Sequence, residues 1–207
     1  MFDNVRADLR HAREINGLPP GVFSLWVKTP LHLGSIAVLT YRLSSWARRV
    51  RVPVLRQVLL VLTAIERRFV ELVTGVWISP RAEIGPGLVV HTIYGVFISE
   101  THIGRNCVVQ HGVAITHGVR SIGDDVYFGP GAKVIGRAAI GNNVRVVANS
   151  VVMTDVADNL TVVGVPARIK WRNPALRPAA AAAQPPDGSQ PKPTERESDL
   201  ISPLPLL

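Results

Sequence analysis

Residues 122–152 read IGDDVYFGPGAKVIGRAAIGNNVRVVANSVV, with an apolar residue at every sixth position. The same period extends back to Ile78, with two steps of seven residues, Val96–Ile103 and Ile115–Ile122. Glycine often follows the apolar residue, and a small or aliphatic residue usually stands four positions after it. A helix repeats every 3.6 residues and a strand every two, so neither produces this pattern. The thirteen repeats predict short strands joined by tight turns, wound into a mainly β fold, a parallel β-helix with three sides per coil.

Two regions flank these repeats. Residues 1–77 are predicted to be helical, because spaced apolar residues over 31–49 and a proline-led apolar segment from Pro53 to about Val73 are typical of helices. Residues 173–207 hold eight of the sixteen prolines and an alanine run, which predicts a disordered tail. We therefore expect a helical region over 1–77, a β-helix domain over 78–172 and a tail over 173–207.

The composition of the 207-residue chain excludes several classes of protein. A single cysteine excludes a disulfide framework and a cysteine-rich zinc module. The net charge is +8, but the arginines are not interleaved with aromatic residues as in nucleic-acid-binding motifs. No signal peptide or membrane-spanning segment is visible, so we expect a cytoplasmic protein. The basic excess in residues 1–77 indicates either ordinary exposed helix faces or contact with anionic lipid at the inner face of the membrane.

Coils bring distant residues side by side. Residues one coil apart lie about 4.8 Å from each other, and an early offset of 19 residues predicts one shared edge for Val90, Val109, Phe128 and Val146. The residue pairs that follow these four are His91–Thr92, Gln110–His111, Gly129–Pro130 and Val147–Ala148. This edge therefore combines two histidines and an amide with small residues on the next coils. Proton transfer could take place there, beside a smooth wall that accepts an extended molecule.

Six short motifs lie along residues 75–168: GVWISPRAEIGPG (75–87), SET (99–101), QHGV (110–113), GPGAKVIG (129–136), ANSVV (148–152) and VGVPAR (163–168). Together they resemble the hexapeptide acyltransferases, and specifically the serine O-acetyltransferase family with its exopolysaccharide acetyltransferase relatives. The resemblance covers roughly residues 40–172. It implies a left-handed β-helix, which the period alone does not fix, and a homotrimer or a dimer of trimers. It also implies acetyl-CoA as co-substrate, bound in the groove between neighbouring coils.

The implied reaction is transfer of an acetyl group from acetyl-CoA to a hydroxyl group. A neutral imidazole is the expected base, because an alcohol is a poor nucleophile until its proton is removed. We expect His91 to be this base, with His111 next if His91 is not; the alternative for each is an ordinary exposed corner residue. Glu100 stands at a normally small position, so it either turns outward or orients a histidine. Cys107 fits an inward slot and is expected in the core.

The resemblance also indicates which residues would bind the co-substrate. Gly131 and Ala148 match positions beside the pantetheine arm, where the lack of a bulky side chain is needed. Lys133 and Arg168 are expected to meet the CoA phosphates, and an ordinary solvated face is the alternative. No metal is expected.

Three features depart from the serine acetyltransferase pattern. The family's Asp-His pair reads His91-Thr92 here, and Trp77 stands in place of an acidic residue. The loop that brings a further His and Arg is reduced to residues 118–121. Because these groups would hold the two ends of serine, we expect a small-molecule or lipid-linked sugar of an exopolysaccharide precursor as acceptor, with L-serine as the alternative.

Two other classes of protein stay open. A metal hydratase of the γ-carbonic anhydrase type needs three histidines around zinc at a trimer interface, and His91, His111 and His117 are available. A non-catalytic trimeric scaffold would leave these histidines without a chemical role. Stoichiometric zinc in the purified protein would distinguish the hydratase from a transferase. Absence of acetyl-CoA binding would distinguish the scaffold from a transferase.

Overall fold

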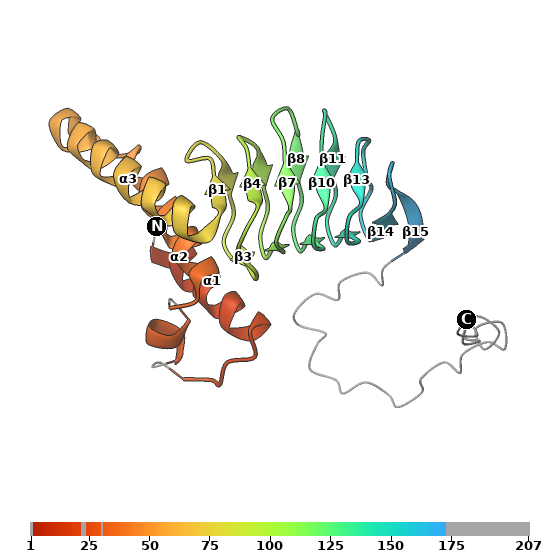
Figure 1. Cartoon of the computed structure of the whole chain (residues 1–207), viewed down its shortest axis with the longest axis horizontal. Coiled ribbons are helices and arrows are strands. Elements are labelled where there is room, and N and C mark those ends of the chain that lie inside the picture. Colours follow the sequence, from red (N-terminus) through yellow and green to blue (C-terminus); the bar gives the residue numbers. More distant parts are fainter. Residues whose placement is uncertain (1, 22–23, 30, 173–207) are drawn as a thin grey trace, which may run out of the picture. The chain divides into compact units, whose positions relative to one another are not determined.

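The computed structural model describes residues 2–21, 24–29 and 31–172. Its helices come first in the chain and lie at one end of a column of short strands (Figure 1). They are α1 (Phe2–Ile15), the short helix η1 (Ser24–Lys28), α2 (Leu33–Ala47) and α3 (Pro53–Thr74). The predicted tail, residues 173–207, lies outside the described residues.

The column has three faces, and the chain visits them in turn. The first face holds β1 (Val76–Ile78), β4 (Val96–Ile98), β7 (Ala114–Ile115), β10 (Lys133–Val134) and β13 (Val151–Val152). The second holds β2 (Glu83–Ile84), β5 (His102–Ile103), β8 (Ser121–Ile122) and β11 (Ala139–Ile140). The third holds β3 (Val89–Val90), β6 (Val108–Val109), β9 (Tyr127–Phe128), β12 (Arg145–Val146), β14 (Leu160–Val163) and the antiparallel β15 (Arg168–Arg172). Each of the other strands pairs in parallel with the strand one coil away, which confirms the predicted parallel β-helix.

The six-residue repeat forms the core of the column. The apolar repeat residues point inward and are fully buried, as at Ile103, Val109, Ile115, Phe128, Val134 and Val146. Cys107 is also fully buried in this core, as expected, and burial raises the pKa of its thiol to about 12. The period therefore fixes which side chain of each short strand faces inward.

The corner between β3 and β4 is longer than the period predicts. The sequence pattern places Val96 beside Ile78, but the strands pair Ile98 with Ile78 and with Ile115. Residues 91–95 absorb the extra length in a wide corner, where Tyr94 and Gly95 adopt φ values of 75° and 70°. The predicted register at Val96 is therefore wrong by two residues. The short step from Ile98 to Ile103 restores the period.

The two predicted helices are confirmed as α2 and α3. Pro53 occupies the first turn of α3, where its missing N–H is not needed. Gly75 ends the helix at φ 64°, and its N–H donates to the carbonyl of Glu71. A Cβ on Gly75 would come within 3.1 Å of the Tyr94 Cα, so the backbones pass closely where the chain enters β1.

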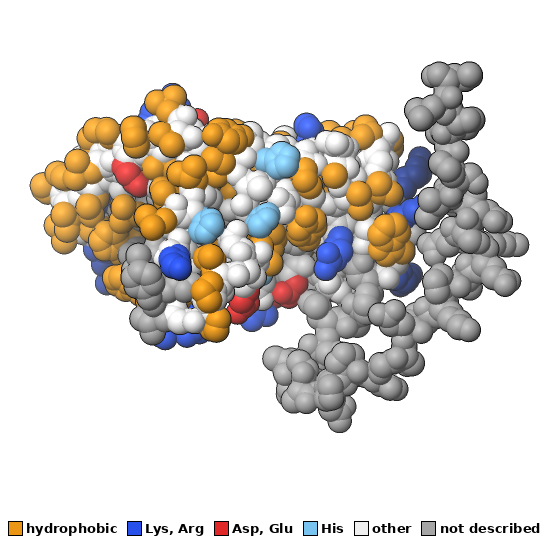
Figure 2. Space-filling view, turned by 60° about the horizontal axis from the view of Figure 1, so that its bottom comes forward, with side chains coloured by type: hydrophobic (Ala, Val, Ile, Leu, Met, Phe, Trp, Pro, Cys, Tyr) orange, Lys and Arg blue, Asp and Glu red, His pale blue; other side chains and the backbone are white. Residues whose placement is uncertain are grey.

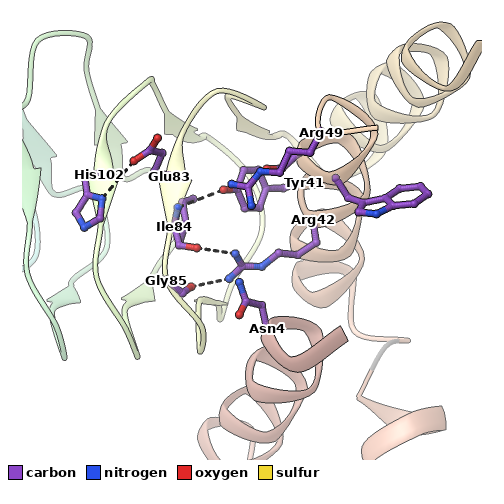
Figure 3. A pocket seen from close by; sticks show the side chains of 10 residues that line it. Asn4, Tyr41, Arg42, Arg49, Glu83, Ile84, Gly85 and His102 are labelled. Atoms are coloured by element: carbon purple, nitrogen blue, oxygen red, sulfur yellow. Dashed lines mark hydrogen bonds and ion pairs between the residues drawn. The ribbon is translucent and has the colours of Figure 1, made fainter. Parts of the chain in front are cut away.

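A buried ion pair joins α1 and α2 to the first coil. The Arg42 Nε donates to Asp8 Oδ2 at 2.8 Å, with both side chains almost fully buried. The same guanidinium donates to the carbonyls of Ile84 and Gly85, each at 2.6 Å (Figure 3). Asp8 Oδ1 accepts further hydrogen bonds from the N–H groups of Gly87 and Leu88. Because every charge has hydrogen-bonding partners, the pair fixes the helices on the column.

One face of α3 is apolar and exposed. The residues on it follow the alternating three- and four-residue spacing of a heptad repeat: Leu55, Val58, Leu62, Ile65, Phe69 and Leu72, each between 48% and 80% exposed. Figure 1 shows α3 projecting from the column, and Figure 2 shows the helical end covered with hydrophobic side chains. Among the described helices, none is long and apolar enough to cross a membrane.

Candidate active site

One edge of the column carries both candidate histidines. The register pairs Val90 with Val109, and Phe128 with both Val109 and Val146, which confirms the predicted shared edge. The corners after β3 and β6 therefore lie one above the other. Figure 2 shows histidine side chains on the surface of the column, surrounded mainly by uncharged groups.

Thr92 links the two corners. Its hydroxyl oxygen accepts a hydrogen bond from the backbone N–H of His111 at 2.8 Å and lies 3.0 Å from His111 Nδ1. The hydroxyl donates to Gln110 Oε1 at 2.9 Å. The structure thus brings His111 into a hydrogen-bonded cluster with Gln110 and Thr92, two residues that the sequence pattern places on this edge but to which it assigns no role.

His91 occupies the same edge in a different environment. Its backbone N–H donates to the carbonyl of Val109, as the coil requires. Its imidazole is partly buried, and Nδ1 is buried without a hydrogen-bond partner among the described residues. The ring is therefore placed at the edge but is not oriented by a polar neighbour in this part of the chain.

Small residues continue the edge beyond His111. The N–H of Gly131 donates to the His111 carbonyl at 2.9 Å, and Gly131 adopts φ 70°. A Cβ on Gly131 would come within 2.1 Å of Asn149 Oδ1, so the Asn149 side chain would have to shift, and the positive φ would strain any other residue here. Ala148 is exposed at the corresponding corner of the next coil. Together they form the smooth strip that an extended pantetheine arm would need.

The two residues expected to contact the CoA phosphates, Lys133 and Arg168, differ in how near they lie to this strip in the sequence. Lys133 is exposed, and its Nζ donates to the Gly131 carbonyl at 3.2 Å, so it borders the small residues directly. Arg168 is exposed at the start of β15 and pairs with Val163 of β14. Both side chains are free to approach a phosphate from solvent.

Glu100 lies at a different corner, between β4 and β5. It is exposed, and its carboxylate lies 3.9 Å from Arg81 Nη1. Within the part of the chain that the structure describes, it makes no hydrogen bond or ion pair with a histidine. Its outward orientation is the first of the two expected alternatives. His117 is exposed at the corner after β7, also away from the Thr92 edge.

An aromatic pair beside this edge escaped the sequence analysis. Trp77 in β1 and Phe97 in β4 point outward from the first face and stack, with ring centroids 4.5 Å apart and an interplanar angle of 11°. Both are central residues of three-residue strands that pair in the structure. The two-residue register error at Val96 hid this pairing, since the predicted alignment put Phe97 beside Ser79.

A hollow of about 520 Å³ lies at the junction of the helices with the first coils. Tyr41 and Arg42 line it from α2, Arg49 lines it from the turn after that helix, and Glu83 and His102 line it from the column (Figure 3). The Tyr41 hydroxyl donates to the Ala82 carbonyl at 2.7 Å, and His102 Nδ1 lies 3.7 Å from Glu83. Glu83 and His102 belong to the second face, so this hollow is separate from the histidine edge. Within residues 2–21, 24–29 and 31–172, no three His, Cys, Asp or Glu side chains gather as a metal site.

Known proteins share this architecture. Residues 121–153 match the family described as bacterial transferase hexapeptide (six repeats). A serine acetyltransferase of Synechococcus elongatus is 36% identical over 181 residues, 84% of this chain and 70% of the relative. A serine acetyltransferase of Mycobacterium tuberculosis is 35% identical over 82% of this chain and 73% of the relative. A serine acetyltransferase from Brucella abortus strain S19, solved in complex with coenzyme A, superposes with a TM-score of 0.68 at 25% identity, over 84% of this chain and 68% of that one. These likenesses confirm the left-handed β-helix with a helical N-terminal region.

Proposed function

The chain belongs to the serine acetyltransferase family, whose members are acetyl-CoA-dependent acyltransferases, and from this membership we propose L-serine as its acceptor. The observation that carries the proposal is the 36% identity over 84% of the chain with a relative named for this reaction. The sugar acceptor expected from the sequence has no such support among these relatives, and so becomes the second candidate.

One observation favours that second candidate. Trp77 stands where the family pattern has an acid, and its stack with Phe97 presents a flat apolar surface beside the β3–β4 corner. An aromatic ring presents a large apolar contact surface but, unlike the family's acid, it cannot form an ion pair with the amino group of serine. A sugar hydroxyl of an exopolysaccharide precursor, small or lipid-linked, fits such a surface.

We propose that the reaction takes place on the edge formed by His91, Thr92 and His111. A histidine there removes the acceptor proton, which contributes about 10²–10⁴-fold to the rate. Bound acetyl-CoA supplies the thioester carbonyl that the acceptor oxygen attacks. Gly131 and Ala148 leave room for its pantetheine arm, and Lys133 and Arg168 are the proposed phosphate contacts. Glu100 would take part only if another copy of the chain brought it to this edge.

The proposed assembly is a homotrimer. Contiguous apolar surface of the kind seen on α3 marks an interaction site. Its first two heptads place leucine at Leu55 and Leu62 and β-branched residues at Val58 and Ile65, an order that favours three or more strands, whereas the third heptad has Phe69 and Leu72. A dimer of trimers, or contact of the basic helices with a membrane, would form in addition to the α3 contact between subunits. We propose that the enzyme works in the cytoplasm.

An acceptor comparison tests the proposed function. Purified protein is incubated with acetyl-CoA and either L-serine or nucleotide- and lipid-linked sugars, and free thiol is measured. Thiol release that depends on L-serine supports the proposal, and release only with a sugar replaces the first candidate by the second. Absence of both thiol release and acetyl-CoA binding in calorimetry contradicts it in favour of a scaffold. Stoichiometric zinc in the purified protein would instead favour a hydratase.

A further inference from the structure

The hydrogen bonds of Thr92 determine where the proton of His111 lies. A threonine hydroxyl has one proton to donate and two lone pairs that accept. Thr92 gives its proton to Gln110 Oε1 at 2.9 Å and accepts from the backbone N–H of His111 at 2.8 Å. With the Gln110 amide oriented so that Oε1 faces Thr92, the 3.0 Å contact with His111 Nδ1 is a hydrogen bond in which Nδ1 is the donor.

We infer that Gln110 and Thr92 hold neutral His111 as the Nδ1–H tautomer, so that its Nε2 is the proton acceptor of the transferase. The two imidazole nitrogens divide these roles, because a neutral ring has one donor and one acceptor. Thr92 is then a positioning residue and His111 the base. This inference rests on the proposed function, and it assigns the base among the two candidate histidines.

Two further observations favour His111 over His91. Nothing among the described residues orients the ring of His91, whose buried Nδ1 has no partner. His111 is instead bonded through its backbone on both sides, from its N–H to Thr92 and from its carbonyl to Gly131. It also adjoins the small-residue strip of Gly131 and Ala148, where the thioester is expected. A fixed ring next to the reacting carbonyl is what general base catalysis requires.

In this scheme one side chain, that of His111, both accepts the proton and gives it back. As the acceptor oxygen bonds to the thioester carbonyl carbon, its proton passes to Nε2 of His111. The resulting imidazolium keeps its Nδ1–H hydrogen bond to Thr92. When the carbon–sulfur bond breaks, the leaving sulfur takes the Nε2 proton, and CoA departs as the thiol. His111 ends the cycle in its starting tautomer.

Nitrogen NMR of the whole protein, with ¹⁵N-labelled histidine, tests the inference. In alkaline solution, where the imidazole is neutral, protonated and unprotonated ring nitrogens have distinct shifts, and the His111→Ala variant identifies the His111 signals. We expect the proton on Nδ1 in the wild type. Gln110→Leu removes the acceptor of the Thr92 proton, so the hydroxyl should turn to Nδ1 and move the His111 proton to Nε2. Turnover should then fall about tenfold or more.

Matched variants separate this role from a structural one. Thr92→Val should lose both the Nδ1–H tautomer and turnover, while Thr92→Ser should restore both. Thr116→Val is the control, because among the described residues the Thr116 hydroxyl bonds only the backbone carbonyl of Val134, at another corner. A wild-type proton on Nε2, or a tautomer and turnover unchanged in both Gln110→Leu and Thr92→Val, would overturn the inference. If the wild type transfers acetyl to no acceptor yet carries the Nδ1 proton, the proposed function fails and the tautomer assignment stands.

Discussion

The hydroxyl oxygen of Thr92 lies 3.0 Å from Nδ1 of His111, although the two residues are 19 positions apart in the sequence. A β-helix makes such contacts regular, because each coil places its corners directly over those of the coil before. The polar residues of the edge are therefore close to one another for the same reason that the apolar repeat residues share a core.

Replacing His111 by alanine should lower turnover at least about a hundredfold, because general base catalysis is lost. The fold should persist, since the side chain is exposed at a corner. Thiol release from acetyl-CoA and far-ultraviolet circular dichroism measure the two effects. His102→Ala is the control, because His102 is an exposed histidine on another face. Near-normal turnover in His111→Ala together with a large loss in His91→Ala would move the base to His91.

A bulky side chain at Ala148 should block the pantetheine arm. Ala148→Trp is expected to raise the KM for acetyl-CoA about tenfold or more without unfolding the protein, because Ala148 is exposed. Ala157→Trp, at an exposed position on a different corner, is the matched control. Equal KM values for the two variants would show that the co-substrate does not pass Ala148.

The pair Asp8–Arg42 should contribute strongly to stability. Asp8→Ala leaves the Arg42 charge buried without its partner, so the free energy of unfolding should fall by about 3–5 kcal/mol. Urea unfolding followed by circular dichroism measures this loss. The exposed pair Arg68–Glu71 supplies the comparison, and Glu71→Ala should change stability little. Similar losses in both variants would contradict the role given to the buried pair.

Charge on the apolar face of α3 should dissociate the proposed homotrimer. Leu62→Glu places a carboxylate at the centre of the heptad face, whereas Gln57→Glu adds the same charge on the same helix outside it. Light scattering after gel filtration should give monomers for the first variant and trimers for the second. A Leu62→Glu trimer would refute this contact, and a wild-type monomer that binds anionic vesicles through α3 would assign the face to lipid.

Cys107 should be protected by the core. Burial raises the pKa of its thiol from 9.0 to about 12, so the thiolate that reacts with disulfide reagents is absent near neutral pH. Because the folded state binds this proton more tightly than the unfolded state, the stability it contributes is complete below pH 9 and falls between pH 9 and about pH 12. Reagent uptake should appear only on unfolding, and rapid uptake by the native protein would contradict the burial.

The sequence pattern predicts more of the coil than of the site. The period identifies the three-sided column and the neighbouring corners of His91 and His111, because inward positions repeat along the chain. The period misplaces Val96, because the wide corner at residues 91–95 adds extra residues. Counting residues between apolar positions does not show whether such extra residues belong to a turn or to a strand. The bonds of Thr92 depend on side-chain rotamers, which periodicity does not encode. The heptad spacing of α3 is visible in the sequence. The sequence does not show which face of α3 the other helices leave exposed.

A crystal structure of the protein with coenzyme A is the most direct test of the histidine edge as the site of acetyl transfer. The account predicts the pantetheine arm along Gly131 and Ala148, with its sulfur within hydrogen-bonding reach of His111 Nε2, directly or through one water. A sulfur bound at another corner of the column, away from Thr92 and His111, would contradict it.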